Sequence, residues 1–135
     1  MTLRKGQILE LKIEKLCFGG RGLARVNGFA VFVERTVPGD EVRARVFRRK
    51  KNHAEARVLE LITPSPFRVA PPCPYSGFCG GCPWQFLDYE KQLSVKRELV
   101  VEALEHIGGL REVPVNPVIA SEKKFQYRNK MEFSF

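Results

Sequence analysis

The chain has 135 residues, of which 44% are hydrophobic, so it can build the core of one ordinary domain or two small ones and is not a disordered chain. No apolar run approaches the ~20 residues that cross a bilayer, and the N-terminus lacks the apolar stretch of a signal peptide. We therefore expect a cytoplasmic protein that does not enter a membrane. The formal net charge of +8 favours a polyanionic partner such as RNA, although a solvated basic face explains the same charge.

The excess charge is concentrated in the first part of the chain. Residues 1–62 contain 14 Lys and Arg against 7 Asp and Glu, whereas residues 63–135 contain 9 against 8. We expect residues 1–62 to form an OB-like barrel of five short strands, because short alternating segments are separated by turn signals at regular spacing. The turn signals are a glycine-rich stretch, an Asn-Gly pair and a Pro-Gly-Asp triplet, at residues 17–22, 27–28 and 38–40.

A row of basic side chains is predicted on the outside of this barrel. If Val42, Ala44 and Val46 point inward, Arg43 and Arg45 must point outward, because side chains change face at every residue of a strand. The following loop extends the row, and one further arginine lies in the glycine-rich turn. The predicted RNA-binding residues are Arg21, Arg43, Arg45, Arg48, Arg49, Lys50 and Lys51.

Residues 63–87 are expected to be a proline-rich linker followed by a metal-binding loop. Five prolines between residues 64 and 74 forbid a helix and disfavour a central strand. Cys73, Cys79 and Cys82 then follow with the spacing C-x5-C-x2-C, and thiolates bind soft metals. Three unliganded thiols in a turn are the alternative, but so close together among prolines and glycines they have no core to fill.

The metal is expected to be iron in a [4Fe–4S] cluster. A structural zinc site usually has two separated pairs of ligands, whereas here the third cysteine lies in the same loop and no second pair follows. Both kinds of site need a fourth ligand. The candidates are Cys17 in the glycine-rich turn, His53 in a basic strand and His106 near a helix end, each of which has an ordinary structural role as its alternative.

Residues 88–135 are predicted to contain one helix and further strands. Asp88 can cap the helix, and Gly108-Gly109 can end it. Apolar residues recur at helical spacing at Leu93, Val100, Leu104 and Ile107, with Leu99 and Ala103 beside them. Segments 115–120 and 125–135 have the pattern of strands. An alternating strand that stops at the last residue indicates a fragment, the start of a truncated central domain.

The chain resembles a known family along nearly its whole length. Residues 18–25 (FGGRGLAR), 31–33 (VFV) and 37–42 (VPGDEV) are similar to the TRAM domain, an OB-like RNA-binding barrel. Residues 72–85, from PC through CGGCPWQ, resemble the cluster loop of the bacterial RNA uracil-5-methyltransferases, the TrmA-like family. Residues 127–130 (YRNK) resemble a motif at the start of that family's central domain.

The resemblance implies a specific activity for the parent protein. Members of the family methylate carbon 5 of a uridine in rRNA or tRNA with S-adenosylmethionine as donor, using a cysteine nucleophile and a flipped-out base. Four cysteines hold their cluster, and three of these match Cys73, Cys79 and Cys82. No cysteine follows Cys82, and no glycine-rich loop for S-adenosylmethionine is found, so this chain alone is expected to be inactive.

Two other classes of function remain open at this point. One is a stand-alone TRAM-type RNA-binding module without catalysis, and the other is a zinc-stabilised interaction domain. For the leading interpretation we expect a monomer whose partner is RNA, either rRNA or tRNA. A coloured protein with bound iron and sulfide would separate the cluster from zinc.

Overall fold

The computed structural model describes residues 3–135, and Met1 and Thr2, which the expected first domain includes, lie outside the described residues. Six strands form one mixed sheet: β1 (Ile8–Lys12), β2 (Lys15–Leu16), β3 (Gly22–Val26), β4 (Phe29–Val33), β5 (Glu41–Arg49) and β6 (His53–Thr63). They are followed by a single α-helix, α1 (Tyr89–Glu102), which continues into a π-helical turn, η1 (Ala103–Ile107). Among residues 3–135 no helix is long and apolar enough to cross a membrane.

The sheet winds into a barrel-like form but is not closed. Its strand order is β1-β5-β6-β4-β3-β2, so β1 and β2 are the two ends, and β4 pairs with β6 in parallel while the other pairs are antiparallel. The predicted OB-like barrel is confirmed as an architecture. The number of strands was underestimated, because the two-residue β2 is too short to produce an alternating pattern.

Alternation of small apolar side chains builds the barrel core. Val42, Ala44 and Val46 of β5 are 0–1% exposed and pack with Ala54 and Ala56 of β6. Small side chains such as alanine fit the narrow interior of a small barrel. The Asn27–Gly28 pair forms the predicted hairpin turn, and both residues have the positive φ, 50° and 81°, that such a turn requires.

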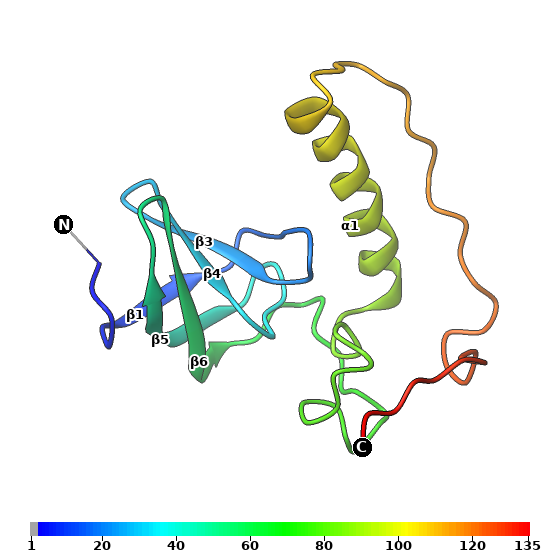
Figure 1. The fold of residues 1–135 in the computed structure, drawn as a ribbon, viewed down its shortest axis with the longest axis horizontal. Helices are drawn as coiled ribbons and strands as arrows, with labels where there is room; N and C mark the ends of the chain where they lie inside the picture. Colours follow the sequence, from blue (N-terminus) through cyan, green and yellow to red (C-terminus); the bar gives the residue numbers. More distant parts are fainter. Residues whose placement is uncertain (1–2) are drawn as a thin grey trace.

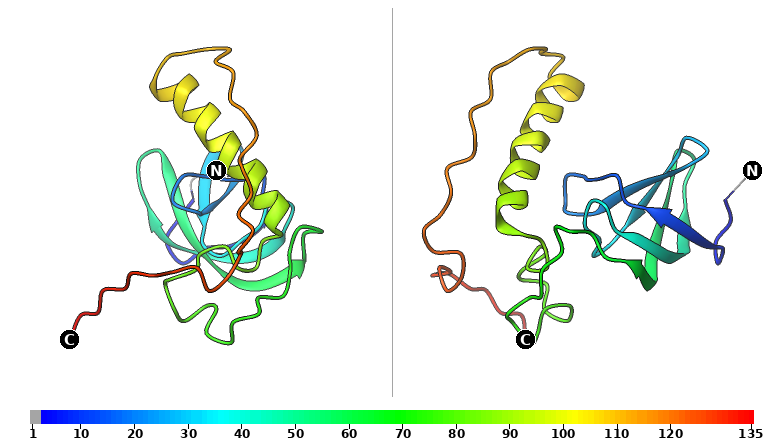
Figure 2. Two further views of the ribbon diagram at one scale, coloured as in Figure 1. Left: turned by 90° about the vertical axis from the view of Figure 1, so that its right-hand side faces the viewer. Right: turned by 180° about the vertical axis from the view of Figure 1, so that it is seen from behind.

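Helix α1 stands beside the barrel, and the two are joined by residues 64–88 (Figures 1 and 2). Asp88 caps α1 as predicted, since its carboxylate accepts a hydrogen bond from the Lys91 N–H at 3.2 Å. The expected apolar stripe packs only in part, because Leu93 and Leu104 are half-buried whereas Val100 and Ile107 are 49% and 88% exposed. Val95 is buried instead, four residues before the partly buried Leu99.

The strands predicted at residues 115–120 and 125–135 are not formed. This part of the chain runs back along α1 in extended form and is largely exposed (Figure 1). A strand needs a neighbour for its backbone hydrogen bonds, and no strand among residues 3–135 pairs with these segments. Side chains hold the segment locally: Arg97 donates to the Val115 carbonyl at 2.8 Å, and Arg128 donates to the Gly81 carbonyl at 2.9 Å.

Candidate nucleic-acid interface and cysteine loop

The predicted basic row lies on the outer face of the barrel. Arg43 and Arg45 are exposed while Val42, Ala44 and Val46 are buried, so the predicted orientation of β5 is confirmed. Orientation alone does not make these side chains free for a ligand. Their carboxylate neighbours decide which of them present an uncompensated charge.

Three of the predicted arginines are paired with carboxylates. Arg43 contacts Glu10 at 2.9 Å and Glu60 at 2.6 Å, and its hydrogen bond to Glu10, with the charge of Glu60, raises the pKa of Arg43. Arg21 and Arg48 lie 3.6 and 4.0 Å from the same carboxylate, Glu55. These ion pairs occupy the guanidinium groups with which an arginine would contact a phosphate, so the three arginines present less free charge than the sequence predicts.

The remaining predicted residues keep free charges. Within residues 3–135, no ion pair is found for Arg45, Arg49, Lys50 or Lys51, and all four are exposed. The guanidinium of Arg49 lies 5.6 Å from the centre of the Phe29 ring, so this arginine is positioned by a cation–π contact. The unpaired charge therefore lies toward the turn between β5 and β6.

One arginine of this surface was not predicted from the sequence. Arg57 on β6 is the direct cross-strand partner of Arg45, and both are exposed. The Arg57 guanidinium lies 4.8 Å from the centre of the Phe47 ring. Like charges opposite one another destabilise a sheet, and guanidinium groups beside an aromatic ring suit a nucleic acid. The alternation of Ala54 and Ala56 in the sequence indicates that Arg57 points outward, so Arg57 could have been predicted as part of this surface.

The cysteine loop is shaped by its own backbone. Phe78 and Cys79 both donate their N–H groups to the Tyr75 carbonyl at 3.0 Å, and Gly77 has a φ of 111°. The Gly81 N–H points at the Cys79 sulfur, 3.4 Å away, as expected for a loop whose amides turn toward thiolates. All three loop cysteines are free thiols, and Cys79 and Cys82 are exposed.

The donor set fits a soft metal, but the sulfurs are not gathered. Across residues 3–135 no three or more His, Cys, Asp or Glu side chains form a group that could hold a metal ion. The three free thiols and the amide directed at sulfur agree with the chemistry of a cluster loop. Binding would therefore require the exposed loop to close around the metal.

The three candidates for a fourth ligand lie in different places. Cys17 is in the glycine-rich turn of the barrel, where burial raises the pKa of its thiol. His53 packs edge-on against Phe32, with ring centres 5.3 Å apart, and lies 3.6 Å from Glu55. His106 is exposed in η1. None of them is brought together with the loop cysteines in a metal-holding group within the described residues.

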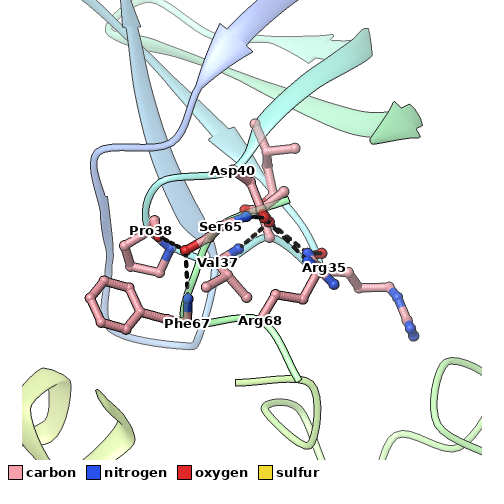
Figure 3. A network of polar contacts seen from close by, with 9 residues as sticks. Arg35, Val37, Pro38, Asp40, Ser65, Phe67 and Arg68 are labelled. Atoms are coloured by element: carbon pink, nitrogen blue, oxygen red, sulfur yellow. Dashed lines mark hydrogen bonds and ion pairs between the residues drawn. The ribbon is translucent and has the colours of Figure 1, made fainter. Parts of the chain in front are cut away.

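A buried carboxylate ties the linker to the barrel (Figure 3). Asp40 is fully buried and accepts hydrogen bonds from the N–H groups of Val37 and Ser65, at 2.7 and 2.9 Å. Arg68 completes the network with bonds of 2.6 and 3.2 Å to the two carboxylate oxygens. The sequence identified Pro38-Gly39-Asp40 only as a turn, because partners 25 and 28 residues away leave no local signal.

A second apolar cluster joins the barrel to the cysteine loop and α1. Phe86 and Leu87, just after the loop, pack with Leu16 and Val37 of the barrel and Val95 of α1. The indole N–H of Trp84 donates to the Gly20 carbonyl at 3.3 Å, and Lys15 pairs with Glu102. The cysteine loop is thus attached to the glycine-rich turn of the barrel.

Comparison with known proteins agrees with this architecture. Residues 3–59 match the TRAM domain family. Uncharacterized RNA methyltransferases of Gloeobacter violaceus and Aquifex aeolicus are each 46% identical to the chain, over 98% and 96% of it. The crystal structure of Pyrococcus abyssi tRNA (uracil-54, C5)-methyltransferase in complex with S-adenosyl-L-homocysteine is 36% identical, with a TM-score of 0.52. That match covers 80% of this chain and 23% of the other.

The chain spans 29% and 30% of the length of these two curated relatives. These matches cover nearly every residue of the chain, so they extend over the barrel, the linker with the cysteine loop, and the helix. Residues 3–59 are thus a TRAM domain, in a chain that is similar over nearly its whole length to these RNA methyltransferases.

Proposed function

We propose that this chain is the RNA-binding and cluster-binding portion of an S-adenosylmethionine-dependent RNA uracil-5-methyltransferase that acts on rRNA or tRNA. The observation that carries the proposal is the similarity across almost the whole chain to RNA methyltransferases, together with 36% identity to a tRNA (uracil-54, C5)-methyltransferase. Because the chain spans under a third of its relatives, the catalytic residues and the methyl-donor site are assigned to the remainder of the parent protein.

The barrel is proposed to bind RNA through its unpaired cations and the half-buried ring of Phe47. Arg45, Arg57 and the lysines of the β5–β6 turn attract the phosphate backbone, and Phe47 beside Arg57 offers a ring on which a base can stack. The electrostatic part of this binding does not depend on sequence. The barrel therefore supplies affinity for RNA, and the choice of uridine belongs to the rest of the enzyme.

Cys73, Cys79 and Cys82 are proposed as three ligands of a [4Fe–4S] cluster. When bound, such a cluster crosslinks its loop and supplies a redox-capable centre. The chain's own contribution is the loop geometry. The Gly81 amide is directed at the Cys79 sulfur, and the loop is anchored on both sides, by Gln85, which accepts from the Cys73 N–H, and by Trp84.

Two measurements test these assignments separately. Anaerobic purification of the chain should give a brown protein with iron, sulfide and broad absorbance near ~400 nm. Cys79→Ser should lose the iron, whereas Cys17→Ser, in the barrel, should retain it. A colourless chain with one zinc per molecule would reject the cluster. For the enzyme, the full-length parent should form 5-methyluridine in tRNA or rRNA, and the 135-residue chain should form none.

A further inference from the structure

A hollow opens where two paired strands of the barrel separate. β4 pairs with β6 only as far as Val33 and Ala56, and beyond that point β6 continues to Thr63 with β5 as its neighbour. The chain after β4 turns away, and a hollow of about 330 Å³ lies beside the exposed edge of β6. We name it the β4–β6 hollow; its lining residues are Glu34, Arg35, Val42, Arg57, Val58, Leu61 and Arg68.

The charges in this hollow are of two kinds. Arg68 forms an ion pair with the buried Asp40, at 2.6 Å. No ion pair is found within residues 3–135 for Arg35, Arg57 or Glu34, and all three are exposed. The hollow is therefore lined by two arginines and one glutamate whose charges are unpaired within the described part of the chain. A simple anion would be attracted by Arg35 and Arg57 but repelled by the carboxylate of Glu34. The ligand that complements the hollow therefore carries both a phosphate and hydrogen-bond donors.

The arginine at the entrance is held in place. Arg35 has a φ of 59°, a left-handed conformation that is uncommon for a residue with a side chain. Its guanidinium lies 5.8 Å from the centre of the Phe86 ring and so close to Gly77 that a Cβ there would come within 2.8 Å. Its carbonyl accepts a hydrogen bond from Arg68 at 3.3 Å. A cation fixed in this way loses little freedom when it binds an anion.

The rest of the hollow suits a nucleobase. Val58 and Leu61 provide an apolar wall, and Leu61 is 38% exposed although it lies in a strand. A carboxylate accepts two parallel hydrogen bonds from adjacent donors. Guanine alone among the four RNA bases has two adjacent N–H donors, N1–H and N2–H, on its Watson–Crick edge. Glu34 is placed to distinguish it from adenine, uracil and cytosine.

We propose that the β4–β6 hollow binds one unpaired guanosine nucleotide of the RNA, with its phosphate on Arg35 and Arg57, its base face on Val58 and Leu61, and its Watson–Crick edge on Glu34. This rests on the proposed RNA binding and adds a base preference to it. The TRAM barrel then contributes selectivity as well as affinity, at a position separate from the uridine that is methylated.

The test uses the 135-residue chain and fluorescein-labelled single-stranded RNA of twelve uridines, with or without one central guanosine. Fluorescence anisotropy at low salt should show about 10-fold tighter binding of the guanosine oligonucleotide, the discrimination expected of a bidentate contact. Replacing guanosine with inosine, which lacks the N2 amino group, should remove most of that gain. This comparison changes only the RNA, so it does not depend on whether a protein variant folds.

Two variants assign the contacts. Glu34→Gln should abolish the preference for guanosine while binding of the all-uridine RNA stays within about twofold, and Glu98→Gln on α1 serves as its matched control. Arg57→Gln should weaken binding of both oligonucleotides several-fold, and Arg57→Lys should restore part of the loss. Equal affinity of the wild type for the two RNAs would overturn the proposed guanosine site while leaving the proposed RNA binding intact. A preference for guanosine retained by Glu34→Gln would do the same. Failure to bind either oligonucleotide would overturn both.

Discussion

Trp84 and Gly20 bring the segment after the cysteine loop into contact with the glycine-rich turn of the TRAM barrel. The indole N–H of Trp84 donates to the Gly20 carbonyl at 3.3 Å, across 64 residues of sequence. A Cβ at Gly20 would lie 2.9 Å from the same indole nitrogen, and Gly20 has a φ of 85°. Only glycine fits here, for both the conformation of the turn and the distance to the ring. The glycine-rich turn and the loop are therefore built to fit each other.

Gly20→Ala should destabilise the chain by about 2 kcal/mol, because the new methyl group is strained at positive φ and also displaces Trp84. Gly28→Ala is the matched control. Its φ of 81° is similar, but nothing lies within 4 Å of the added Cβ, so the loss should be about 1 kcal/mol. Urea unfolding monitored by Trp84 fluorescence measures both values. Equal losses would show that the contact with Trp84 contributes nothing.

Asp40→Asn should cost about 3–5 kcal/mol, the range found when one member of a buried ion pair is removed. An amide nitrogen cannot accept a hydrogen bond, so in either orientation it would face Arg68 together with the N–H of Val37 or of Ser65 without satisfying them. Asp88→Asn is the control, since asparagine caps a helix about as well as aspartate. Urea midpoints of the two variants decide the matter. If Asp40→Asn lowers the free energy of unfolding no more than Asp88→Asn does, the hydrogen-bond network around Asp40 does not stabilise the fold.

The periodic parts of the fold could be predicted from the sequence. Alternation around Val42 fixed which side chains of β5 are buried, and the Asn27–Gly28 pair located a hairpin with the expected dihedral angles. These signals are local, because each depends on residues a few positions apart. The helix was found in the same way, from the Asp88 cap to the glycine after η1.

Interactions between distant residues could not be predicted. Nothing near Arg43 in the sequence shows that Glu10 and Glu60 neutralise it, and nothing near Glu34 shows that β6 separates from β4 beside it. The strands expected at residues 115–120 and 125–135 failed for the opposite reason. Their local pattern is that of a strand, but a strand forms only where a partner offers its backbone.

Arg45→Gln should weaken RNA binding and at the same time raise stability slightly. Its direct cross-strand partner is Arg57, so removing one charge relieves a repulsion of a few tenths of a kcal/mol. Removing one cation that binds a phosphate of single-stranded RNA should reduce the slope of log K against log salt by about 0.7. Arg43→Gln is the matched control, two residues away on the same strand. Because Glu10 and Glu60 already hold the Arg43 guanidinium, this substitution should reduce affinity and slope less than Arg45→Gln does.

Titrations of RNA binding between low and moderate salt, with thermal unfolding of the same samples, check this prediction. The informative result is that Arg45→Gln weakens RNA binding while it raises the thermal stability of the chain. If Arg43→Gln weakens binding as much as Arg45→Gln does, the ion pairs of Arg43 open on contact with RNA. The whole basic row, and not its unpaired part, would then be the interface.

Burial of Cys17 gives a prediction about pH. Burial raises the pKa of this thiol above its ordinary value of 9.0, an effect that the nearby Lys15 opposes and Glu102 reinforces. The unfolded chain therefore releases the Cys17 proton at lower pH than the folded chain does. The contribution to stability is complete below the unfolded pKa and is lost as pH rises through the folded pKa.

Between pH 8 and 10, the urea midpoint of the wild-type chain should therefore fall more steeply than that of Cys17→Ser, which has no thiol to titrate. Alkylation by iodoacetamide at pH 8 should also be slower at Cys17 than in a short peptide with the same sequence, because the thiolate is the reacting species. Mass spectrometry of tryptic peptides reads the rate at Cys17 separately from the loop cysteines. A rate at Cys17 equal to that of the peptide would show that the glycine-rich turn leaves the thiol open to water.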